Sequence, residues 1–75
     1  MPFNGAKLRE IRLRQALTLR EIGALSGVAY DTIHGIETGK QAPRPSTVRK
    51  LADALGVVPA AFFSEADDQE GKAAA

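Results

Sequence analysis

The chain has 75 residues and no cysteine, so we expect one small domain that neither a disulfide nor a thiolate metal site stabilises. No apolar run approaches the roughly 18 residues needed to span a membrane, and the first residues lack the apolar segment of a signal peptide, so we expect a cytoplasmic protein. The formal net charge is +1, but residues 1–63 hold nine Lys or Arg against five Asp or Glu, whereas residues 64–75 hold one Lys against four Asp or Glu, an asymmetry typical of chains that meet polyanions.

The first predicted helix extends to about Ala16. Leu8 and Ile11 recur there at helical spacing among basic residues, which indicates an amphipathic helix of about three turns. Either Asn4 or Gly5 can start it.

A second helix is predicted directly after Thr18, over residues 19–26. In the stretch TLRE, the Thr18 hydroxyl can accept from the amide of Glu21, and the Glu21 carboxylate can accept from the amide of Thr18, which is a capping box. Ile22 and Leu25 are expected to face inward. Gly27 follows where this helix must stop, because glycine adopts a left-handed backbone at little cost.

Three further helices are predicted beyond Gly27. One spans residues 30–38 and ends at the stretch TGK, and one starts at Pro45 and ends before Gly56, since proline suits the first turn of a helix. The stretch VVPAAFF, residues 57–63, reads as a one-turn fifth helix. No strand alternation is present, so the fold class expected for residues 1–63 is a compact all-α domain of five helices. The acidic tail, residues 64–75, is expected to be disordered.

The centre of the chain carries the pattern of a helix-turn-helix at about residues 18–38. Two short helices joined by a tight turn cross steeply, so a small residue is needed where they meet, and Gly23 stands there, four residues before Gly27. Val28 is the apolar residue of the turn, and Ile33 and Ile36 can face back onto the first helix. Such a unit presents its second helix to the major groove of DNA.

The sequence resembles the phage repressor/Cro-type helix-turn-helix family, often called XRE-like, over roughly residues 6–63. The stretches that carry the resemblance are LREIRLRQALTLREIGALSGV, DTIHGIETGK and LADALGV. The resemblance implies a small DNA-binding transcriptional regulator, a repressor by preference, that binds a palindromic operator as a homodimer with helix 30–38 in the major groove.

The resemblance also implies which residues contact bases: Tyr30, Asp31, Thr32, His34 and Gly35. Asp31 can accept from a cytosine amino group, Tyr30 can touch a thymine methyl or a phosphate, and His34 can donate to guanine or to a phosphate. The helix dipole alone also favours Asp31 near a helix start, and His34 is equally well explained as a solvated residue.

Phosphate contacts are implied for Thr18 and the backbone at Leu19, and for Lys40 and Arg44 in the loop after the third helix. Arg12 and Glu37 match a structural ion pair of the family. Phe62 and Phe63 cannot both bury easily in so small a core, so one is expected to close the monomer and the other to form a dimer contact.

Several positions depart from the family pattern. Leu19 replaces a frequent glutamine, Ala29 replaces the usual Ser or Thr cap of the third helix, and Gly35 stands at a position often held by a longer polar or basic residue. The outer face of the third helix therefore has no Lys or Arg to read guanine.

The sequence also bears on functions other than DNA-binding regulation. An enzyme is not expected, because the single histidine has no cysteine or paired carboxylates near it in sequence, and no metal site or cofactor is expected. The alternatives are an antitoxin, a restriction–modification controller, or a helix-turn-helix module that binds a partner protein and no DNA.

Overall fold

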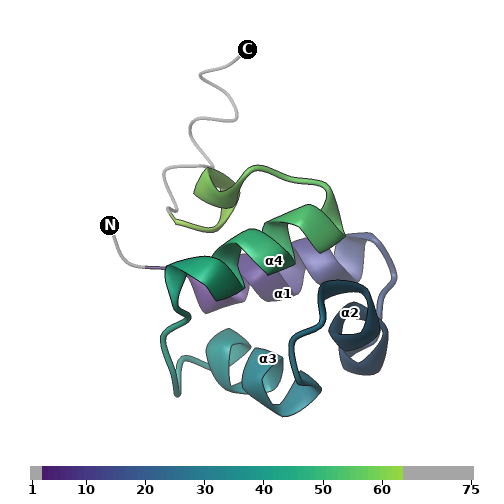
Figure 1. Cartoon of the computed structure of the whole chain (residues 1–75), viewed down its shortest axis with the longest axis horizontal. Coiled ribbons are helices and arrows are strands. Elements are labelled where there is room, and N and C mark those ends of the chain that lie inside the picture. Colours follow the sequence, from purple (N-terminus) through teal and green to yellow (C-terminus); the bar gives the residue numbers. More distant parts are fainter. Residues whose placement is uncertain (1–2, 64–75) are drawn as a thin grey trace.

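The computed structural model describes residues 3–63, which form four α-helices and one short 3-10 helix (Figure 1). Helix α2 packs on α3 and α4, α1 packs on α3, and the 3-10 helix lies against α1 and α4. In Figure 1, α2 and α3 lie together on one side of the molecule, and the 3-10 helix lies on the opposite side. The acidic tail predicted for residues 64–75 lies outside the described residues.

Helix α1 spans Gly5–Arg14. The Asn4 side chain caps it by accepting from the Lys7 amide at 3.2 Å, which confirms one of the two predicted starts. The helix ends two residues earlier than predicted, because Ala16 adopts a positive φ of 57°, which an α-helix does not allow. The Gln15 side chain donates to the carbonyl of Leu55 at 2.7 Å, so the end of α1 is joined to the end of α4.

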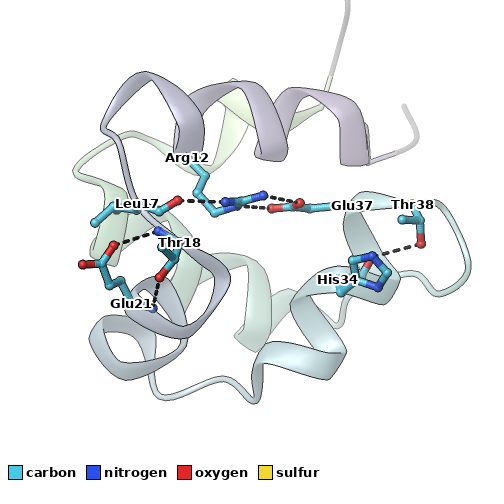
Figure 2. Close-up of polar contacts among 7 residues, drawn as sticks. All are labelled: Arg12, Leu17, Thr18, Glu21, His34, Glu37 and Thr38. Carbon is cyan, nitrogen blue, oxygen red and sulfur yellow. Dashed lines mark hydrogen bonds and ion pairs between the residues drawn. The ribbon is translucent and has the colours of Figure 1, made fainter.

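Helix α2 spans Leu19–Ser26 and begins with the predicted capping box. The Thr18 hydroxyl accepts from the Glu21 amide at 3.0 Å, and the Glu21 carboxylate accepts from the Thr18 amide at 2.8 Å (Figure 2). Gly27 ends the helix with a φ of 79°, and its amide donates to the carbonyl of Gly23 at 2.9 Å. Both ends of α2 are therefore set by short-range signals that the sequence displays.

Helices α3 and α4 span Tyr30–Glu37 and Pro45–Leu55. Ala29 gives α3 no side-chain cap, as its side chain predicts, and Pro45 occupies the first turn of α4. The segment after Gly56 differs from the prediction: Pro59–Phe62 is a single 3-10 turn, η1, so the described chain has four α-helices and not five. The segment has only four residues, and the amides of Ala61 and Phe63 donate to the carbonyls of Val58 and Ala60, which is the i to i−3 pattern of a 3-10 helix.

The core contains side chains from every helix. Its buried members are Leu8, Ile11, Ile22, Ile33, Ile36, Val48, Leu51, Ala52, Leu55 and Phe62. The prediction that Leu25 faces inward is wrong, since that side chain is 61% exposed. The inward stripe of α2 follows Leu19, Ile22 and Ser26, which leaves Leu25 on the flank. Among residues 3–63, no helix has the length and apolar character to cross a membrane.

Candidate nucleic-acid interface

Helices α2 and α3 meet closely because of Gly23. A Cβ atom at this position would lie 3.1 Å from the carbonyl oxygen of Val28 and 3.6 Å from the Cβ of Tyr30, so a larger residue would push the two helices apart. Ile33 is completely buried on the inner side of α3. This arrangement is the predicted helix-turn-helix, and it leaves the outer side of α3 open.

The outer side of α3 presents three of the five residues expected to contact bases. Tyr30, Asp31 and His34 are exposed, and Thr32 is half-buried beside them. Asp31 lies in the first turn of α3, where the helix dipole favours its negative charge. The outer surface of α3 thus carries an aromatic ring, a carboxylate and an imidazole, and no Lys or Arg from its own helix.

Gly35 does not lie on that open surface. It is buried, and the side chain of Gln41 covers it. The resemblance places Gly35 among the base-contacting residues, but a glycine offers no side chain and the loop after α3 folds over its position, so a base contact by Gly35 stays a prediction.

Arg20 is a cation at the start of the interface that the sequence pattern did not predict. The guanidinium carbon of Arg20 lies 4.7 Å from the centre of the Tyr30 ring, a cation–π contact that joins the first turn of α2 to the first turn of α3. The available signal was an arginine one turn before the small residue of α2 and an aromatic residue at the start of α3. The contact places a positive charge beside the outer face of α3.

The start of α2 still has backbone donors for an anion. The capping box engages the amides of Thr18 and Glu21, whereas those of Leu19 and Arg20 donate to no acceptor in residues 3–63. The Thr18 hydroxyl accepts from Glu21 but can still donate its own proton. Two amides and one hydroxyl therefore remain for a phosphate at this helix start.

Lys40 and Arg44 lie on the other side of α3. Both are exposed on the loop that joins α3 to α4. The Lys40 amide donates to the carbonyl of Gly35 at 2.8 Å, which fixes the start of this loop against the end of α3. In Figure 1, this loop and α2 lie on opposite sides of α3, so groups that suit phosphates flank the helix on both sides.

Arg12 and Glu37 lie together inside the protein. Arg12 donates from Nε and Nη2 to the two Glu37 carboxylate oxygens at 2.7 and 2.9 Å, and from Nη1 to the carbonyl of Leu17 at 2.8 Å (Figure 2). Donating hydrogen bonds to the Glu37 carboxylate raises the pKa of Arg12 above its usual value, although burial opposes this. Glu37 ends α3, where the dipole disfavours a carboxylate, and Arg12 offsets that cost. The pair holds α3 in place and is not part of the open surface.

The two terminal phenylalanines separate. Phe62 is completely buried, with its ring centre 5.3 Å from that of Phe3, so of the two phenylalanines it is the one that closes the monomer, and a dimer contact stays a prediction for Phe63. Phe63 is half-buried, contacts Phe3 edge-on at 5.5 Å, and lines a groove of about 400 Å³ with Pro43, Val48 and Arg49. Phe3 was missed because its partners lie about 60 residues away in the chain.

Comparison with known proteins gives related regulators. A family model described as "Helix-turn-helix domain" matches residues 5–62. The chain is 44% identical over 57 residues to the uncharacterised HTH-type transcriptional regulator RghRB of Bacillus subtilis (strain 168), covering 75% of this chain and 40% of that protein. It is 41% identical over 61 residues to the HTH-type transcriptional regulator PuuR of Escherichia coli (strain K12), covering 81% and 33%. The chain thus spans less than half the length of these two regulators.

A solved structure is similar over most of both chains. The restriction-modification controller protein C.AhdI from Aeromonas hydrophila superposes with a TM-score of 0.77 at 32% identity. The match covers 79% of this chain and 89% of that chain.

Proposed function

Because this chain belongs to the helix-turn-helix family, as its resemblance to the phage repressor/Cro type predicted, we propose that it is a sequence-specific DNA-binding transcriptional regulator, in the first instance a repressor. The observation that carries the proposal is the outer face of α3, which is open between the start of α2 and the Lys40–Arg44 loop. An α-helix fits the major groove, and the groups on either side of α3 suit the two phosphate backbones that border it.

Sequence preference comes from the side chains on the outer face of α3. Tyr30, Asp31, Thr32 and His34 approach base edges in this proposal, and Asp31 has the most specific chemistry because a carboxylate accepts from a cytosine amino group. The Tyr30 ring, held by Arg20, contacts a thymine methyl or the adjacent phosphate.

Affinity comes from contacts to phosphates. Thr18 and the amide of Leu19 bind one phosphate, Arg20 adds a positive charge beside it, and Lys40 and Arg44 bind the opposite backbone. Such contacts release counterions, so the dissociation constant should rise steeply with salt.

We further propose that two copies bind a palindromic operator. Half-sites would lie about one helical turn, roughly 34 Å, apart. Phe63 is the remaining candidate for the dimer contact, since it is half-buried at the edge of an apolar groove.

The test is selection of bound duplexes from a random pool, followed by affinity measurements at two salt concentrations. An enriched inverted repeat with a steep salt dependence supports a dimeric operator-binding regulator. The matched variant is the double charge reversal Lys40→Glu and Arg44→Glu, which should abolish selection while leaving the fold intact, because both residues are exposed. A chain that selects no sequence, and that tolerates this reversal, is instead a protein-interaction module.

A second candidate is control of a restriction–modification system. It is favoured by the match to C.AhdI, which covers 89% of that chain, whereas the regulators RghRB and PuuR are more than twice as long as the matched segment. If it holds, the selected operator should occur upstream of a neighbouring methyltransferase or restriction gene. An operator found only elsewhere in the genome would contradict it.

A further inference from the structure

Gly35 is a buried residue on the outward side of α3. At 3.6 residues per turn, position 35 lies about 40° around the helix from Asp31, whereas the core-facing Ile33 and Ile36 lie on the far side. A side chain at position 35 would therefore project toward the same surface as Asp31 and His34. Its burial has a local cause, namely the chain segment that covers it.

The covering group is the side chain of Gln41. A Cβ atom added to Gly35 would overlap the amide nitrogen Nε2 of Gln41 and would lie 2.9 Å from its Cγ. The Gln41 backbone is held there, because its amide and that of Lys40 both donate to the Gly35 carbonyl, at 3.2 and 2.8 Å. Gln41 thus occupies the volume that a side chain at position 35 would fill.

The chemistry of Gln41 suits the place it occupies. The residue is exposed, its amide nitrogen lies against Gly35 of α3, and its side-chain amide makes no hydrogen bond within residues 3–63, so its donor and acceptor groups remain available to a ligand beside α3. A glutamine amide pairs with adenine, whose N7 accepts and whose N6 donates in the major groove. On this basis we propose that Gln41 supplies the base-reading side chain that Gly35 lacks and that it recognises an adenine in each half-site.

This inference rests on the proposed function, since it requires α3 to enter the major groove. It adds a specificity residue from the loop to a helix that has no Lys or Arg on its outer face. It also explains why a glycine stands at position 35, because any larger residue there would occupy the space that the Gln41 side chain fills.

The first experiment compares the duplexes selected by the wild-type chain with those selected by Gln41→Met and Gln41→Glu. Methionine keeps an unbranched side chain over Gly35 but has no amide, so the preference for adenine at one position of each half-site should fall by about tenfold or more. Glutamate only accepts, so the preference should move from adenine toward cytosine at that same position. Circular dichroism melts check that both variants fold.

The second experiment removes the space for Gln41 instead of its amide. Gly35→Ala places a methyl group where Nε2 lies, and the flexible end of Gln41 must move away. This variant should lose the same adenine preference as Gln41→Met, and the double variant should lose no more than either single one. Alanine is the better helix former, so folding is retained.

The outcomes separate the two proposals. If the wild-type chain selects an operator and the variants lose preference at one shared position, the inference stands. If the wild-type chain selects an operator but the variants keep every preference, or lose affinity equally on all sequences, the inference is overturned and the DNA-binding function remains. If the wild-type chain selects no sequence, the DNA-binding proposal fails and the inference falls with it.

Discussion

At the scale of single residues, we expect substitutions in the ion pair of Arg12 and Glu37 to lower the free energy of unfolding more than substitutions in the exposed ion pairs. Both side chains are buried, and all of the hydrogen bonds described for the guanidinium go to Glu37 and to the carbonyl of Leu17. Removing one partner leaves a buried charge unpaired, which costs about 3–5 kcal/mol, a large part of the stability of a domain of this size.

We therefore expect Arg12→Ala to unfold most of the protein, as measured by urea titration with circular dichroism. The matched control is Arg14→Ala on the same helix: Arg14 donates to Glu10 at 2.8 Å, but both are well exposed, so the loss should be below about 1 kcal/mol. Replacing both partners, as in Arg12→Met with Glu37→Leu, should recover part of the loss, although the Leu17 carbonyl then lacks its donor. Equal losses for Arg12→Ala and Arg14→Ala would contradict a special role for the buried pair.

Asp31 allows a test of recognition at the same scale. Asp31→Ala should change the preference at one base pair by about 1–3 kcal/mol, with little change elsewhere in the site, because a base contact acts on one pair. Affinity measured on a panel of single-base variants of the selected operator gives the result. An equal loss of affinity on every duplex would mean that Asp31 contacts no base and only stabilises the start of α3 through the helix dipole.

At the scale of elements, the sequence predicted those helix starts and ends that interactions between neighbouring residues determine. The capping box at Thr18, the left-handed glycine at Gly27 and the proline at the start of α4 each act within about four residues, and all three appear where expected. The sequence did not predict the contacts between distant segments: Leu25 lies outside the core although it was expected inside, Phe62 packs against Phe3, and Gln41 covers Gly35. Periodicity gives the faces of a helix, but it does not say which neighbour covers each face.

The start of α2 combines a structural and a proposed binding role, and substitutions at Thr18 separate them. Thr18→Ala should lower the free energy of unfolding by about 1 kcal/mol, because the capping hydroxyl is lost. Thr18→Asp keeps a capping oxygen, so stability should be largely retained while DNA affinity falls, since the carboxylate repels a phosphate. Thr18→Ser is the control that keeps both. If Thr18→Asp binds DNA as well as wild type, no phosphate lies at this helix start.

At the scale of the whole molecule, charge is divided between the body and the end of the chain. Residues 1–63 have four more basic than acidic residues, and residues 64–75 have three more acidic than basic ones. All of the core described above lies within residues 3–63, so a chain that ends at Phe63 should fold. That shorter chain should bind DNA roughly two- to tenfold more tightly at low salt, because the acidic residues no longer oppose the phosphates.

The advantage of the shorter chain should vanish as added salt screens the charges. Fluorescence anisotropy of labelled duplexes at low and high ionic strength measures it. A difference that persists at high salt would indicate that residues 64–75 act by some means other than their charge.

The contacts of Arg12 also have a consequence for how the protein opens. From α1, this side chain reaches the end of α3 and the segment before α2, so neither can leave without breaking its hydrogen bonds. In native-state hydrogen exchange, the amides of Ile11, Ile33 and Ile36 should consequently exchange through one shared opening of α1 and α3, with equal protection factors. A helix that does not loosen separately meets its ligand as a rigid body and has little conformational entropy left to lose on contact.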